Sequence, residues 1–117
     1  MALAHLSGAV DFTVLESMTG GLDEVTLEVL DLYTHQASLW APLLDPRHEG
    51  WRDALHTLRG ASLGIGAVAL GQACLEAEAL EAAAAMPAVD RVISALNQTL
   101  SDVAIYRHAI VMRSLKS

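Results

Sequence analysis

The sequence predicts an all-α protein, an antiparallel four-helix bundle with a short N-terminal lid helix. Alanine and leucine dominate the composition and only 4% of the residues are aromatic, which favours helices over sheets. Apolar residues recur every three or four positions over four long segments, as they do on amphipathic helices. Short links containing glycine or proline separate these segments, and helices joined by short links pack antiparallel.

The 117 residues fit one domain with a single core. We expect a flexible leader over residues 1–10 and one helical domain over residues 11–117. Asp11 can cap a short first helix that runs to about Met18. Thr19, Gly20 and Gly21 then end this helix, since glycine is the usual residue just past a helix C-terminus.

The second helix is predicted to start at Leu22 and to reach Pro42, which should kink or end it. Asp45 and Pro46 mark a turn or a new start. Apolar side chains keep a helical spacing of three or four residues along this segment: Val25, Val29, Leu32, Tyr33, Leu39, Trp40 and Leu43.

A third helix is predicted to begin near Gly50 and to end at Gly64 and Gly66. Its inner face is expected to carry Trp51, Leu55, Leu58, Ser62 and Ile65. The fourth helix should stop before Pro87 and bury Leu70, Ala73, Cys74, Ala77 and Leu80. The last helix spans about seven turns, with an apolar stripe of Val89, Val92, Ile93, Leu96, Leu100, Val103 and Ile110.

The bulk properties exclude several classes of protein. The formal net charge of −7 opposes binding to a nucleic-acid backbone, which requires a basic face. No apolar run approaches the roughly 18 residues that a membrane span needs, and the N-terminal ten residues lack the basic start of a signal peptide. The single cysteine, Cys74, cannot form an intramolecular disulfide, which fits a reducing cytoplasm.

The most informative residues are His56, Arg59 and Gly60. On a helix, positions three and four residues after His56 are its immediate neighbours, so one surface carries an imidazole, a cation and an absent side chain. His56 lies about 100° from Leu55, at the edge or outside of the buried stripe. This arrangement suits a histidine that an anionic group approaches from outside. Glycine within a helix costs roughly 1 kcal/mol relative to alanine, so Gly60 serves either access for a partner or close packing between helices.

The segment from His56 to Glu78 resembles the histidine-containing phosphotransfer (HPt) domain, whose pattern is approximately H-x-L-K-G-x-S-x-x-x-G-A-x-x-L-x-x-x-C-x-x-L-E. Arg59 replaces the usual lysine and keeps its charge, whereas Ala77 stands where leucine is usual. Trp51 and Tyr33 extend the resemblance to the flanks. Nine positions match the pattern in register: His56, Leu58, Gly60, Ser62, Gly66, Ala67, Leu70, Cys74 and Glu78.

The resemblance implies that the protein relays a phosphoryl group between aspartate receiver domains of a two-component phosphorelay. His56 would accept the group, Arg59 would stabilise its charge, and Gly60 would give access. The expected partners are response-regulator receiver domains and a hybrid or sensor histidine kinase. The protein itself is expected to be monomeric and cytoplasmic. No cofactor is expected on this chain, since the receiver would supply Mg²⁺, and no ATP site is visible for autonomous kinase activity.

Arg52, Leu63 and Glu78 are predicted to support the site. Glu78 either hydrogen-bonds the imidazole and fixes its tautomer or is a solvated carboxylate. Arg52 either extends a basic patch that includes Arg47 or covers Trp51. Ser62 is expected to hydrogen-bond inside the bundle, and Cys74 to be a core residue.

Two other functions are compatible with a helical chain of this composition. The first is a non-catalytic adaptor that binds a partner through an apolar groove and carries no phosphate. The second is a ligand or metal carrier, which is less favoured because no Glu-x-x-His pair occurs. No Gly-rich phosphate loop or nucleophile elbow is present. The sequence does not identify the kinase, the regulators, the direction of phosphate flow or the output.

Overall fold

The computed structural model describes residues 5–116, and these contain helices and connecting segments but no strand. The all-α class is therefore confirmed. Five α-helices follow one another along the chain: α1 (Phe12–Thr19), α2 (Asp23–Trp40), α3 (Trp51–Ile65), α4 (Val68–Glu78) and α5 (Met86–Ser114). Two short 3₁₀ helices, η2 (Ala41–Leu43) and η3 (Ala82–Ala84), lie in the links before α3 and α5.

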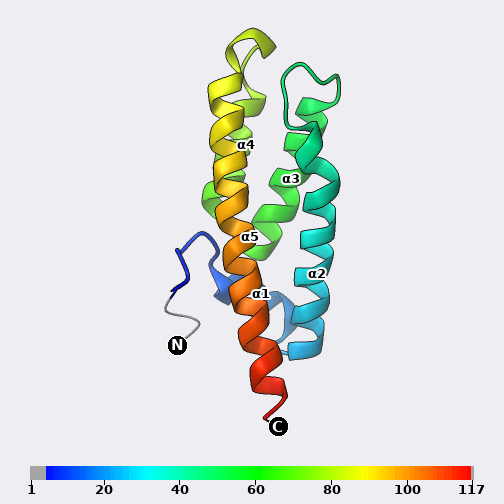
Figure 1. Cartoon of the computed structure of the whole chain (residues 1–117), viewed down its shortest axis with the longest axis vertical. Coiled ribbons are helices and arrows are strands. Elements are labelled where there is room, and N and C mark those ends of the chain that lie inside the picture. Colours follow the sequence, from blue (N-terminus) through cyan, green and yellow to red (C-terminus); the bar gives the residue numbers. More distant parts are fainter. Residues whose placement is uncertain (1–4, 117) are drawn as a thin grey trace.

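The two longest helices, α2 and α5, run along an elongated molecule of 53 × 23 × 21 Å (Figure 1). The shorter α3 and α4 pack against each other over most of their length and occupy one end. There α4 also packs on α5, and α3 on α2. Successive helices from α2 to α5 run in opposite directions (Figure 1). No helix of the described residues is long and apolar enough to cross a membrane.

The short helix α1 lies below the C-terminal end of α3 (Figure 1) and contacts α2 and α3. Asp11 caps it through its side chain, and Gly20 ends it in the left-handed conformation, as predicted. Gly66 ends α3 in the same way, with φ +91°. The Asp11 amide donates a 2.9 Å hydrogen bond to the Gly66 carbonyl. A Cβ atom on Gly66 would collide with the Asp11 carbonyl oxygen, so this junction requires glycine.

The apolar positions at helical spacing along α2 do not all face the core. Tyr33 is buried, and Val29 and Trp40 are partly buried against the core. Leu32 and Leu39 are 56% and 58% exposed, and Val25 is also exposed. The face that packs inward carries Thr26, Leu30, Tyr33 and Ala37. It includes two polar residues because each finds a partner: the Thr26 hydroxyl lies 2.7 Å from that of Thr19, and the Tyr33 hydroxyl bonds Ser62. Satisfied hydroxyl groups can be buried at little cost.

The stripes predicted for α3 and α5 agree better with the structure. All five residues predicted on the inner face of α3 are buried, and in α5 only Ile93 and Leu100 are partly buried rather than fully. In α4 the buried residues are Leu70, Gly71, Cys74 and Ala77, whereas Leu80 lies beyond the helix and is exposed. Pro87 belongs to the first turn of α5, where its missing N–H costs nothing.

Part of the segment that we expected to be a flexible leader, residues 1–10, is hydrogen-bonded to α5. The buried Asp102 carboxylate accepts hydrogen bonds from the Ser7 amide, the Ser7 hydroxyl and the Ala9 amide, at 2.8–3.2 Å. Val10 is buried in the core. Residues 1–4 of the predicted leader lie outside the described residues. An acceptor 95 positions away in the chain gives no local pattern from which this contact could be predicted.

Candidate functional site

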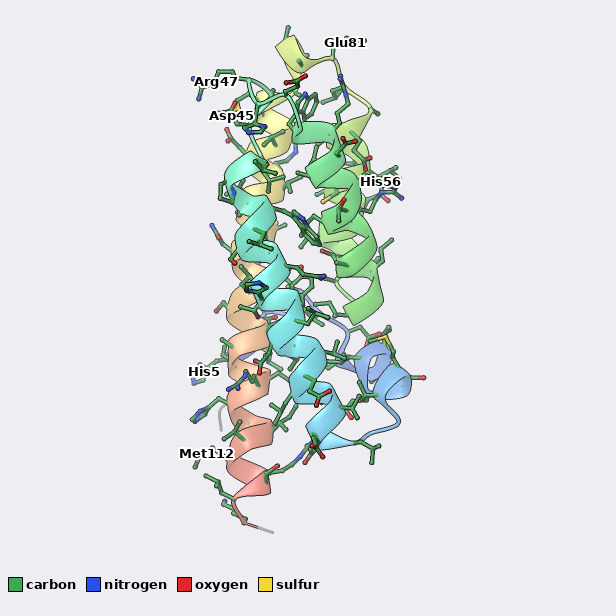
Figure 2. All side chains as sticks on the ribbon, turned by 90° about the vertical axis from the view of Figure 1, so that its right-hand side faces the viewer. His5, Asp45, Arg47, His56, Glu81 and Met112 are labelled. Atoms are coloured by element: carbon green, nitrogen blue, oxygen red, sulfur yellow. The ribbon has the colours of Figure 1, made fainter. Side chains whose placement is uncertain are left out.

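His56 lies in the middle of α3, and its side chain is 67% exposed. Figure 2 shows it projecting outward from one side of the molecule. The neighbours Leu55 and Leu58 are fully buried, so the helix presents its apolar face to the core and the imidazole to solvent. This agrees with the position of His56 off the predicted stripe.

The imidazole contacts one cation and one carboxylate. Arg59, one turn later on α3, places Nη2 at 3.0 Å from Nδ1 of His56. Glu78, on α4, places Oε1 at 3.3 Å from the same nitrogen. The Arg59 Nε donates to Oε2 of Glu78 at 3.1 Å, which closes a three-residue cluster. The structure thus decides between the two readings of Glu78: it bonds the imidazole rather than standing free in solvent.

Both contacts of the imidazole with this cluster converge on Nδ1. No hydrogen bond from residues 5–116 reaches Nε2, the other nitrogen of the ring. When Nδ1 carries the proton and donates it to Glu78, Nε2 holds the lone pair. Nε2 is then the nitrogen available to an electrophile that approaches from solvent.

The surface beside His56 is open over Gly60. A Cβ atom at Gly60 would meet no atom within 4 Å, which rules out close helix packing as the reason for this glycine. The packing glycine is Gly71 on α4, where a Cβ would come within 2.6 Å of Leu63 Cδ2. Leu63 therefore lies across the α3–α4 contact while remaining 43% exposed. Gly71 was not among the predicted site residues, because a single glycine within a helical segment does not indicate which helix approaches it.

The basic side chains predicted around the site are each engaged. Arg52 lies with its guanidinium carbon 4.4 Å from the Trp51 ring centroid and donates to the Leu80 carbonyl at 2.7 Å. It therefore covers Trp51 and binds a carbonyl group just after α4, where helix ends attract cations. Arg47 pairs with Asp45 at 2.7 Å in the loop at the end of the molecule, away from His56 (Figure 2).

The core behind the site contains a pair of hydrogen-bonded hydroxyl groups and a buried thiol. The Tyr33 and Ser62 hydroxyl oxygens are 2.9 Å apart and join α2 to α3, so Ser62 bonds within the core as expected. Cys74 on α4 is fully buried. Burial, followed by the negative charge of Glu78, raises the pKa of the Cys74 thiol to about 12. Cys74 is accordingly an unreactive core residue.

Exposed aliphatic side chains accompany the cluster on both helices. Val68 and Leu75 on α4 are 60% and 45% exposed, and Leu75 lies one turn before Glu78. Together with Leu63 they form an apolar border on the helices that carry the polar cluster. Val68 and Leu75 were not among the predicted site residues, although both lie off the buried stripe of α4.

The other histidines have no such surroundings. His35 and His108 are exposed on α2 and α5, and His48 accepts a hydrogen bond from the Gly50 amide in the loop before α3. Over residues 5–116, no three His, Cys, Asp or Glu side chains are grouped so that they could hold a metal ion.

The described residues thus place an exposed histidine at the middle of a helix in an all-α chain, in contact with a cation and a carboxylate. No family model and no curated protein matches the sequence. Among solved structures, the chain is similar to the crystal structure of the histidine phosphotransferase ShpA from Caulobacter crescentus. The two share 45% identity with a TM-score of 0.81, over 92% of this chain and 99% of that one. The chain belongs to the histidine-containing phosphotransfer family.

Proposed function

We propose that this protein carries a phosphoryl group on His56 and relays it between aspartate receiver domains of a two-component phosphorelay. The observation that carries the proposal is the exposed His56 imidazole, whose Nε2 takes no hydrogen bond from residues 5–116, beside the open surface of Gly60. A histidine in a buried or obstructed position could not meet an aspartyl phosphate on another protein. The similarity to a histidine phosphotransferase supports the same reading.

In this mechanism the neutral imidazole attacks phosphorus in line with the aspartyl oxygen that leaves. Phosphoryl transfer passes through a loose transition state, so positioning and charge stabilisation supply most of the catalysis. Glu78 orients the ring through Nδ1, and Arg59 provides a cation one turn from the acceptor. Mg²⁺ would be held by acidic residues of the receiver. The chain itself is an intermediate carrier and needs no ATP site.

The docking surface is proposed to lie on α3 and α4 around His56, with Leu63, Val68 and Leu75 as its apolar border. An arrangement of α2–α5 as an antiparallel four-helix bundle, with α1 as a lid below α3, leaves this surface uncovered. We propose a monomeric, cytoplasmic protein that receives phosphate from the receiver domain of a hybrid kinase, or by way of a sensor kinase, and passes it to a response regulator.

The test is transfer from phosphorylated receiver domains to the purified chain. Phosphate that is labile in acid and stable in base, located on His56 by mass spectrometry, is the expected result. A protein that binds receivers but never acquires phosphate would be the non-catalytic adaptor instead. Phosphate on any other histidine would contradict the assignment of the site.

A further inference from the structure

Nδ1 of His56 is approached by two groups that need opposite states of this nitrogen. Arg59 Nη2, at 3.0 Å, is only a donor and can bond Nδ1 when that nitrogen holds a lone pair. Glu78 Oε1, at 3.3 Å, is an acceptor and can bond Nδ1 when that nitrogen carries a proton. One nitrogen cannot satisfy both at once, so the cluster contains two alternative hydrogen-bonding states.

Building on the proposed relay function, we infer that Glu78 and Arg59 together set the lifetime of the phosphohistidine by competing for Nδ1. In the transfer state Nδ1 is protonated and donates to Glu78. In the storage state Nδ1 is unprotonated and accepts from Arg59. Glu78 is a positioning residue here, because it acts through the ring and touches neither the phosphoryl group nor the receiver.

The protonation state of Nδ1 controls the lifetime because it decides which form of the ring leaves when the Nε2–P bond breaks. In the storage state the phosphorylated ring is neutral, with phosphorus on Nε2 and a lone pair on Nδ1. Breaking the Nε2–P bond from this state would leave an imidazolate, which is a poor leaving group. With a proton from water on Nδ1, the ring is an imidazolium. A receiver carboxylate oxygen then bonds phosphorus, the Nε2–P electron pair returns to Nε2, and a neutral imidazole with Nδ1–H remains. Water attacks phosphorus in the same way during hydrolysis.

Glu78 favours the state that transfers because its carboxylate attracts the imidazolium. Its side chain is only 18% exposed, and that of Arg59 27%, so both are held against the ring and are less screened than surface charges. The other charged residues near the ring on α3 are Arg52 and Asp53, and the remaining carboxylate of α4 is Glu76. Arg52 is bound to Leu80, and α2 faces the opposite, buried side of α3. The competition at Nδ1 therefore lies between Arg59 and Glu78.

The first experiment uses the unphosphorylated protein and so does not depend on the relay. Nitrogen-15 NMR of the His56 ring measures which nitrogen carries the proton at neutral pH. We expect the Nδ1–H form in the wild type, and a shift toward the Nε2–H form in Glu78→Gln. A wild-type ring protonated on Nε2 would overturn the inference, since Glu78 would then not hold the ring.

The second experiment loads His56 with phosphoramidate, a small phosphoryl donor, and follows loss of phosphate without a receiver at pH 5 to 9. In Glu78→Gln the half-life at pH 7 should rise about threefold and the pH profile should move to lower pH by about half a unit. In Arg59→Gln the half-life should shorten, because the storage state loses its donor. Glu76→Gln removes the same charge from the same helix and should leave the half-life unchanged.

Opposite effects of Glu78→Gln and Arg59→Gln on the half-life, together with the shift of the ring proton in Glu78→Gln, are the result expected from competition for Nδ1. Equal half-lives and pH profiles in the wild type and Glu78→Gln, with folding verified by circular dichroism, would overturn the inference. Loading by phosphoramidate without any transfer from receivers would instead contradict the relay function, while the half-life comparison would still test the role of Glu78.

Discussion

The Nε atom of Arg59 donates a 3.1 Å hydrogen bond to Oε2 of Glu78, and this contact ties the C-terminal part of α4 to the middle of α3. The positive charge of Arg59 is thus held in place by an ion pair and does not extend freely into solvent. Because the Arg59 side chain is already ordered, it loses little further conformational entropy when it contacts a phosphoryl group. The same pair brings a carboxylate to the acceptor histidine.

Replacing His56 should remove phosphate acceptance without unfolding the protein. His56→Gln retains a polar side chain at a site that is 67% exposed, so the free energy of unfolding should change by no more than about 0.5 kcal/mol. Transfer from a phosphorylated receiver should fall to background in the variant. Residual label after His56→Gln, with His48→Gln as the matched control, would mean that another residue accepts phosphate.

Replacing Gly60 should separate access from stability. Gly60→Ala places a Cβ in open space and removes the helix penalty of glycine, which should stabilise the protein by about 0.5–1 kcal/mol. Gly60→Gln should block transfer by obstructing the receiver, with the fold intact. Ser94→Gln adds the same side chain to an exposed position of α5 and should transfer normally. Full transfer by Gly60→Gln would show that the receiver does not approach over this residue.

Arg59 should contribute to transfer mainly through its charge. Arg59→Ala should slow transfer from a phosphorylated receiver to His56 at least about tenfold, since a contact to developing charge is commonly worth more than 1 kcal/mol. Arg59→Lys should retain most of the rate. Rapid-quench measurement with one receiver would compare the three proteins. Equal losses in both variants would assign importance to the guanidinium geometry, and no loss in either would leave Arg59 without a part in transfer.

The Cys74 thiol should not react in the folded protein at pH 8. Its pKa is raised to about 12, so almost none of it is thiolate at this pH, and its side chain is fully buried. Iodoacetamide should label it only after denaturation, as followed by mass spectrometry. Labelling of the native protein at a rate typical of free cysteine would contradict the burial of this residue.

Gly66 should tolerate no side chain. Gly66→Ala is expected to lower the free energy of unfolding by about 2 kcal/mol or more, because φ is +91° and the new Cβ would collide with the Asp11 carbonyl. Gly64→Ala is the matched control, since it lies two residues earlier in open space and should be neutral or stabilising. Denaturant unfolding measures both, and equal stability of the two variants would contradict this account of the junction.

The sequence alone determined the all-α class, the order of the helices and the exposed position of His56 on α3. These features follow from local chemistry. The Asp11 cap, the glycines at positions 20 and 66, and the apolar spacing of Trp51, Leu55 and Leu58 each act within one or two helical turns. His56 was placed off the buried stripe by the same spacing, and the residues around it carried the family resemblance.

The tertiary structure decided which face of α2 is buried, since the helix has two apolar stripes. Leu32 and Leu39 form one stripe, which is exposed. The structure buries the other, which carries Leu30 and Ala37, and the hydroxyl groups of Thr26 and Tyr33 on this face find partners on α1 and α3. It also decided the contacts of Glu78 with His56 and of Asp102 with Ser7, which join residues 22 and 95 positions apart. Periodicity within one helix carries no information about such pairs, because they depend on how whole helices are rotated and packed against one another.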